Sequence, residues 1–288
     1  MITTREPPRA AAAGDPPIGL DPVPAGPGWV ARGFASQFFL VPAFFLVVMI
    51  GWETTVNLLR IEAFVLPTPS AIGLELIEMV QSIYFWRDAQ TTAIEMSVGY
   101  LASVGIAMAL GLAVVQIRIV EKVLMPYIVA LQAVPKTALA PVFLIWFGFG
   151  LSSKIVAAAL SAFFPMLINV IVGLKAADRD QVAMLRSFDA SNWQTFRYVE
   201  LPGAMPFIFA GLKIAVVAAL IGAVVGEFVG AQSGLGYRIL QMNFKFNIAG
   251  VFATMVALSA MGLIPYYLLQ FIQRRYVYWG DSSQVTVA

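Results

Sequence analysis

Six long runs of apolar residues alternate with shorter polar stretches along this chain. Each run exceeds about 18 residues, and at roughly 1.5 Å per helical residue that length crosses the hydrocarbon core of a bilayer. The pattern therefore predicts an all-α polytopic membrane protein with six transmembrane helices. The expected spans are residues 36–58, 91–116, 123–148, 153–173, 207–230 and 249–272.

Prolines mark the spans that should not be straight. Pro126, Pro135 and Pro141 interrupt the third run, so we expect a kinked or two-piece helix there, and Pro165 and Pro265 should bend the fourth and sixth. Inside lipid, such breaks persist only where neighbouring groups satisfy the freed carbonyls.

The polar segments divide the chain further. Residues 1–34 hold seven prolines among alanines and glycines, a composition that cannot bury a core, and we expect a disordered cytoplasmic tail rather than a signal peptide. Residues 35–280 should form the transmembrane domain, and residues 281–288 a second cytoplasmic tail. In the loop 60–90, "LPTPSAIGLELIEMVQ" predicts a stiff turn and a short surface helix with Ser70 as its N-cap.

Lysines and arginines set the expected orientation, because cytoplasmic loops are enriched in them. With both termini inside, eleven lie on the inner side and five on the outer side, as expected for a multi-pass protein of a bacterial inner membrane. The inner set is Arg5, Arg9, Arg32, Arg118, Lys122, Lys175, Arg179, Arg186, Arg197, Arg274 and Arg275, and the outer set is Arg60, Arg87, Lys154, Arg238 and Lys245.

The largest inner loop, about 174–206, predicts two short amphipathic helices. Asp178 and Asp180 can cap the first, and Ser191 can cap the second. Each helix has apolar residues at helical spacing, which are Met184, Leu185 and Phe188 in the first and Trp193, Phe196 and Val199 in the second. These faces either pack on the inner ends of the spans or dock into a groove of another protein.

Composition excludes several kinds of chemistry. The chain is 60% hydrophobic and only 12% charged, and its net charge of +2 gives no basis for a nucleic-acid partner. It contains no cysteine and no histidine, and no lysine follows a glycine, so it has neither His-based or thiol chemistry nor a phosphate-binding loop. We expect no metal and no cofactor on this chain, and any ATP must bind to another subunit.

Spacing in the inner loop supports a resemblance to a family. Asp189, Val199 and Leu201-Pro202 lie as in the coupling loop of ABC importer permeases, whose pattern is Glu-Ala-Ala, three residues, Gly, nine residues, Ile, one residue, Leu-Pro. The loop departs from this pattern at 183–185, which is Ala-Met-Leu, and at Asp189, which replaces the glycine. Because Asp tolerates the left-handed region better than most residues, we expect a positive φ at Asp189.

Flanking segments resemble the branch that handles nitrate, sulfonates, taurine and pyrimidine or flavin precursors. The similarity covers about residues 60–280, and the segments that carry it are "LPTPSA", "LQAVPKTALAPVFLIWFGFGLSSKI", "FFPMLINVIVGL", "PFIFAGLKIA" and "GEFVGAQSGLGY".

The resemblance implies a type I importer permease that works by alternating access and performs no covalent chemistry. It implies a homodimer, with a heterodimer left open, together with a cytoplasmic ATPase dimer and an external solute-binding protein. The expected solute is a heteroaromatic such as hydroxymethylpyrimidine or riboflavin, and the alternative is a sulfonate, taurine or nitrate. It assigns ATPase coupling to Ala183, Met184, Leu185, Arg186, Ser187, Phe188, Asp189 and Trp193.

Polar residues in the spans are candidates for lining the solute path, because ionisable groups are costly in lipid and usually face a cavity or a partner. They are Gln132, Lys136, Asn169, Glu95 and Glu227. Lys136 can instead pair with a glutamate, the two glutamates can reach headgroup water, and the amides can tie helices together. Small residues at a four-residue spacing, which are Gly222, Gly226 and Gly230, can pack helices within the chain or across a dimer.

Two rival functions remain open at this point. A secondary transporter working alone usually shows an internal repeat with broken helices in both halves, and none is evident here. An intramembrane enzyme would need a Ser/Lys or Asp/Asp pair, and the expected spans contain no aspartate.

Overall fold

The computed structural model describes residues 37–277 and 279, and every regular element in these residues is a helix. The two tails expected at 1–34 and 281–288 lie outside the described residues. The chain forms two compact units that meet between Trp52 and Glu53, and each is described by itself.

The first unit contains most of α2 (Gln37–Leu58), a helix that is apolar on all sides. Its last residues belong to the second unit. There the Glu53 carboxylate accepts hydrogen bonds from the backbone N–H of Ser70 at 3.0 Å and from its hydroxyl at 2.7 Å.

The short surface helix expected in the loop 60–90 is α3 (Pro69–Gln81), but its N-cap is Thr68 and not Ser70. The Thr68 hydroxyl accepts a hydrogen bond from the N–H of Ala71 at 3.3 Å. Proline is well suited to the first helical position, because it has no N–H to leave unpaired. Pro69 takes that position, so the cap is the residue before it, and Ser70 is left to bind Glu53.

Within the described part of the chain, five helices are long and apolar enough to cross a membrane. They are α2, α4 (Ile83–Gln116), α7 (Leu151–Lys175), α10 (Leu201–Gly230) and α12 (Ile248–Tyr276). Helix α4 begins eight residues before the expected span, so that Asp88 lies inside it. Asp88 thus lies on the same helix as the expected span, although outside its bounds of 91–116.

The third expected span is broken. Helix α5 (Arg118–Gln132) is followed by a 3-10 turn, η1 (Lys136–Leu139), and by α6 (Ala140–Phe147). The two parts are bent by 85° around the break that contains Pro135, and they make a sixth span if they are counted as one. Proline removes an N–H donor and clashes with the preceding turn, which explains the position of the break.

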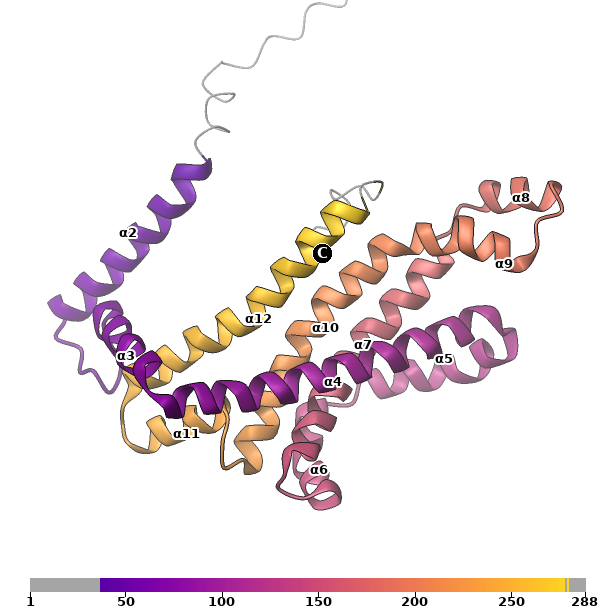
Figure 1. Cartoon of the computed structure of the whole chain (residues 1–288). Coiled ribbons are helices and arrows are strands. Elements are labelled where there is room, and N and C mark those ends of the chain that lie inside the picture. Colours follow the sequence, from indigo (N-terminus) through magenta and orange to yellow (C-terminus); the bar gives the residue numbers. More distant parts are fainter. Residues whose placement is uncertain (1–36, 278, 280–288) are drawn as a thin grey trace, which may run out of the picture. The chain divides into compact units, whose positions relative to one another are not determined.

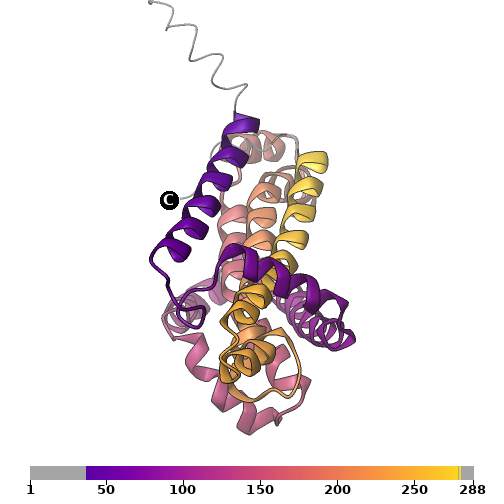
Figure 2. The ribbon, with the colours of Figure 1, turned by 90° about the vertical axis from the view of Figure 1, so that its left-hand side faces the viewer.

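Helix α7 packs along both α4 and α10 and forms the centre of the second unit (Figures 1 and 2). Its buried residues lie on all sides of the helix and include Ala157, Ala158, Ala162 and Gly173, and such small residues allow neighbouring helices to approach closely. Gly222 and Gly226 of α10 face α7, since a Cβ at Gly222 would lie 2.6 Å from the carbonyl oxygen of Ala157 and one at Gly226 would lie 3.2 Å from the Lys154 side chain. Gly230 packs in the same way against Leu144 of α6.

The inner loop forms α8 (Arg179–Ser187), α9 (Asn192–Thr195) and a π-helical turn, η2 (Phe196–Glu200). The expected caps Asp178 and Ser191 are confirmed, whereas Asp180 lies in the first turn of α8. The Asp178 carboxylate accepts from the N–H of Asp180 at 2.9 Å, and Ser191 and Gln194 form a reciprocal capping box. Asp189 has φ +53°, so the expected left-handed residue between the two helices is also confirmed.

Substitutions at Asp189 should separate backbone strain from side-chain chemistry. Asp189→Gly is expected to leave the protection of the α8 and α9 amides unchanged or slightly higher, since glycine adopts positive φ freely. Asp189→Val should raise their hydrogen-exchange rates by about tenfold or more, because a β-branched residue is strained there. Ala183→Val, on an exposed helical position, is the matched control. Equal exchange for the two Asp189 variants would contradict the backbone argument.

Candidate functional site

Two ends of the helical bundle carry the polar residues that can act on a partner or a solute. The α8 end lies where α7 runs into α8 and where α10 begins, and the α11 end lies where α10 runs into α11 (Leu235–Phe244). Helix α10 has 30 residues, so the two ends are separated by roughly 45 Å along its axis.

The α8 end presents an exposed apolar surface, which we call the coupling surface and define as Met184, Phe188 and Trp193. The side chain of Phe188 is 77% exposed. Trp193 stacks on Phe196 with ring centroids 5.6 Å apart, and Phe196 is buried. The loop is thus anchored through Phe196 while the coupling surface has no cover within the described chain.

The remaining expected coupling residues surround this surface. Ala183, Arg186, Ser187 and Asp189 are exposed, and Leu185 is half-buried. A hollow of about 330 Å³ lies behind the loop, between Arg186, Asn192 and Glu200 on one side and the corner joining α4 to α5 on the other. The same end is tied together by an ion pair between Lys175 and Glu121.

At the α11 end, Glu227 is completely buried and joins three elements. Its carboxylate accepts from the Thr92 hydroxyl of α4 at 2.6 Å and from the N–H groups of Gly236 and Tyr237 at 2.5 and 3.2 Å. Thr92 in turn accepts from the N–H of Leu235 at 2.8 Å. The carboxylate therefore holds the first turn of α11 by accepting hydrogen bonds from N–H groups that have no partner within the helix.

Lys154 is buried beside this carboxylate, although the sequence suggested that it lies among the outer loop charges. Only 2% of it is exposed. Its ammonium donates to the carbonyl oxygens of Phe149, Gly150 and Gly230 at 2.5, 3.1 and 3.1 Å. All three of its donors are used, and one of them satisfies the C-terminus of α10.

Glu95 is also buried, so neither glutamate reaches solvent in this chain. One of its oxygens, Oε2, is buried without a hydrogen-bond partner among the described residues. Glu95 and Lys154 line a hollow of about 380 Å³ together with Phe149, Gln232 and Ser233. Glu95 thus contributes a buried carboxyl group to the wall of this hollow.

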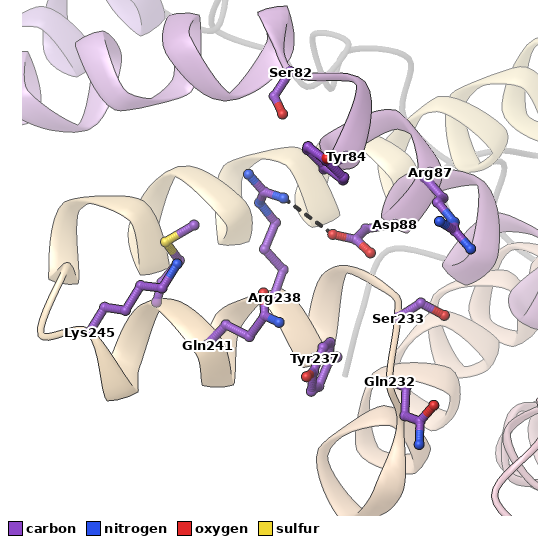
Figure 3. A pocket seen from close by; sticks show the side chains of 11 residues that line it. Ser82, Tyr84, Arg87, Asp88, Gln232, Ser233, Tyr237, Arg238, Gln241 and Lys245 are labelled. Carbon is purple, nitrogen blue, oxygen red and sulfur yellow. Dashed lines mark hydrogen bonds and ion pairs between the residues drawn. The ribbon is translucent and has the colours of Figure 1, made fainter.

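A larger pocket of about 520 Å³ lies at the same end, and we call it the α11 pocket (Figure 3). Eleven residues line it, contributed by α4, by the residue that precedes it, by the loop after α10 and by α11. Arg238 reaches across from α11 to Asp88, with Nη1 and Oδ2 3.2 Å apart, and the other oxygen of Asp88 accepts from the N–H of Gly234 at 3.2 Å. Arg238, expected in an outer loop, is only 9% exposed because of this pairing.

The other proposed path residues lie elsewhere. Lys136 is half-buried, donates to the Gln132 carbonyl at 3.4 Å and lies 5.2 Å above the centroid of the Phe164 ring. Gln132 is exposed. Asn169 donates to the Pro165 carbonyl of its own helix at 2.8 Å. The structure therefore brings Glu95 and Glu227 together with Lys154, and it brings Lys136 to Gln132.

Four residues of the α11 end were missed in the sequence: Asp88, Thr92, Lys154 and Arg238. A signal existed for the first two, since Asp88, Thr92 and Glu95 follow the helical spacing i, i+4, i+7. Lys154 and Arg238 gave no comparable signal, because one partner of Lys154 is 76 positions away and the partner of Arg238 is 150 positions away. In residues 37–277 and 279 no group of three or more acidic residues could hold a metal ion.

The chain is similar to known proteins of one family. The family model described as binding-protein-dependent transport system inner membrane component matches residues 102–278. The formylaminopyrimidine transport permease ThiX of Halalkalibacterium halodurans is 34% identical over 83% of this chain and 95% of its own. The riboflavin transport permease RibX of Chloroflexus aurantiacus is 34% identical over 84% of this chain and 90% of its own.

An aliphatic sulfonates transport permease, SsuC of Bacillus subtilis, is 30% identical over 96% of this chain and 99% of its own. Among solved structures, the MetNI methionine ABC transporter in an inward-facing conformation matches with a TM-score of 0.57 and 21% identity, covering 68% of this chain and 95% of that chain. An amino acid ABC transporter matches with a TM-score of 0.59 and 18% identity, covering 69% and 98%.

These structural likenesses show the fold, and the sequence relatives and the family model show the membership. The match at residues 102–278 covers more than half of the chain and includes α7, α8, α10 and α11. The chain thus belongs to the binding-protein-dependent transport inner membrane components, and it is a permease subunit of an ABC importer rather than the ATPase of one.

Proposed function

We propose that two copies of this chain form the membrane pore of an importer, with the α8 end in the cytoplasm and the α11 end outside. Each copy binds one ATPase subunit through the coupling surface. A solute-binding protein delivers the solute at the α11 end, and ATP-driven closure of the ATPase pair moves α8 and α9 to reopen the path inward.

The observation that carries this proposal is the exposed coupling surface on two capped helices. Apolar side chains spaced along a short helix are what a helix-in-groove contact needs. Anchoring through Phe196 lets the same helices transmit force to α10, because η2 leads directly into it.

The solute class is proposed from the relatives. A heteroaromatic of the hydroxymethylpyrimidine or riboflavin type is the first class to test, since ThiX and RibX are the 34% identical proteins. A sulfonate, taurine or nitrate is the second class, since SsuC is 30% identical.

Reconstitution tests the proposal. We expect uptake into proteoliposomes only when the permease, its ATPase, the loaded binding protein and ATP are all present. A variant ATPase that binds but does not hydrolyse ATP is the control and should stop turnover. Uptake by the permease alone in ATP-free vesicles would overturn the proposal and identify a secondary transporter.

A further inference from the structure

The α11 pocket is lined by three basic side chains, Arg87, Arg238 and Lys245, and by a single carboxylate, that of Asp88. Both oxygens of Asp88 are used, by Arg238 and by Gly234. Among the described residues, no ion-pair partner faces the side chains of Arg87 or Lys245, which lie at the exposed rim. With Asp88 neutralised by Arg238, these two cations leave the pocket with a net positive charge.

Arg238 provides an independent observation. It is more than nine-tenths buried, its Nε is a buried donor without a hydrogen-bond partner among the described residues, and it lines the pocket. Its guanidinium is fixed by Asp88 and lies 5.9 Å from the centroid of the Phe85 ring. Its guanidinium therefore adds a fixed positive group to the wall of the pocket.

The other polar side chains of the pocket are neutral and can donate hydrogen bonds to an anion. Tyr84, Tyr237, Ser233 and Gln241 place hydroxyl and amide groups around the same space (Figure 3). The volume of about 520 Å³ lies within the range of small-molecule sites, and cationic walls around a hollow concentrate anions there.

We propose that the α11 pocket binds the anionic group of a small solute, a sulfonate, a carboxylate or a phosphate, through Arg87 and Lys245 at its rim, with the Arg238 guanidinium in its wall. This names a chemical class for the solute, and its role in transport rests on the proposed function above. It favours a sulfonate, or an acidic derivative of a heteroaromatic, over a neutral ring.

A matched pair of fluorescent probes tests the proposal: riboflavin 5′-phosphate and riboflavin, which differ only in the phosphate. The full chain in nanodiscs of phosphatidylcholine is titrated with each, and anisotropy is measured. We expect the phosphate to bind about tenfold more tightly, and this preference to weaken with salt. Equal binding of the two probes would overturn the proposal.

Variants locate the anion. Arg87→Gln with Lys245→Gln, both at exposed positions, should remove the preference and leave the unfolding temperature unchanged. Lys122→Gln, which removes an exposed cation from the α8 end, should keep it. A preference that persists in the double variant places the anion elsewhere and overturns the proposal.

A lipid headgroup could supply the same chemistry as a free solute. If phosphatidylglycerol in the nanodiscs abolishes the preference for riboflavin 5′-phosphate, the resident anion is a lipid phosphate. If the preference survives, the resident anion is a soluble solute. The titrations contain no ATPase, nucleotide or binding protein. A failure of ATP-driven import would therefore contradict the proposed function but not the anion site. Equal binding of the two probes would contradict the anion site but not the proposed function.

Discussion

Phe188→Asp is expected to abolish ATP-driven uptake while the permease still inserts and folds. Phe188 is 77% exposed and contributes little to packing, so its loss should not change the unfolding temperature of the chain. In a groove of the ATPase, however, a buried carboxylate without a partner would weaken binding by about 2 kcal/mol or more, roughly 30-fold. Co-purification of the ATPase and uptake into proteoliposomes measure the two effects.

The chain offers a matched control for this variant. Phe244 in α11 is 78% exposed and lies at the opposite end of the bundle. Phe244→Asp introduces the same charge at a position that is equally exposed, and the ATPase should remain bound to this variant. Retention of the ATPase by Phe188→Asp, or its equal loss from both variants, would show that the coupling surface does not dock it.

Glu227→Ala is expected to cause the largest loss of stability of any single substitution at the α11 end. It would leave the Thr92 hydroxyl and the N–H groups of Gly236 and Tyr237 without their acceptor in a buried site. Each unpaired group costs about 1–3 kcal/mol, so we expect a net loss of about 3 kcal/mol or more. Thermal unfolding and proteolysis of the segment 231–237 measure it.

Two further variants make this prediction specific. Glu227→Gln keeps an acceptor oxygen and nearly the same volume, and its loss should be smaller than that of Glu227→Ala. Glu121→Ala breaks the exposed ion pair with Lys175 and should cost about 1 kcal/mol or less. If Glu227→Ala and Glu121→Ala unfold at the same temperature, the buried carboxylate does not hold α11.

Sequence reasoning succeeded where the signal is local. Hydropathy located the spans because a bilayer of fixed thickness demands about twenty apolar residues in a row. The caps at Asp178 and Ser191 were predictable, because each depends on residues within three or four positions. The left-handed Asp189 was expected from the resemblance, because it stands where the family pattern has a glycine. The first cap of α3 shows the limit of this approach. It was expected at Ser70 but lies at Thr68, because Pro69 is the residue that starts the helix.

The chemistry of the α11 end was not predictable in the same way. A hydropathy scale assigns Asp88, Lys154 and Arg238 to loops because they carry charge. Their burial follows from partners on other helices, which a local window does not include. Ionisable residues enter a bundle only when such partners satisfy them, so their position is a property of the assembled helices.

By itself, then, the amino-acid sequence determined that the chain is a helical membrane protein, where its crossings lie, and that two capped amphipathic helices follow the fourth of them. Those features arise from the length of apolar runs and from contacts between near neighbours. Only the tertiary structure decided that the third apolar run is bent by 85° and that Glu227 accepts hydrogen bonds from the start of α11. It also decided that Arg238 lines a pocket and that its Nε has no partner among the described residues. The physical reason is that hydrogen bonds and charges in a dry interior pair across helices far apart in the chain, and the folded arrangement alone brings them within reach.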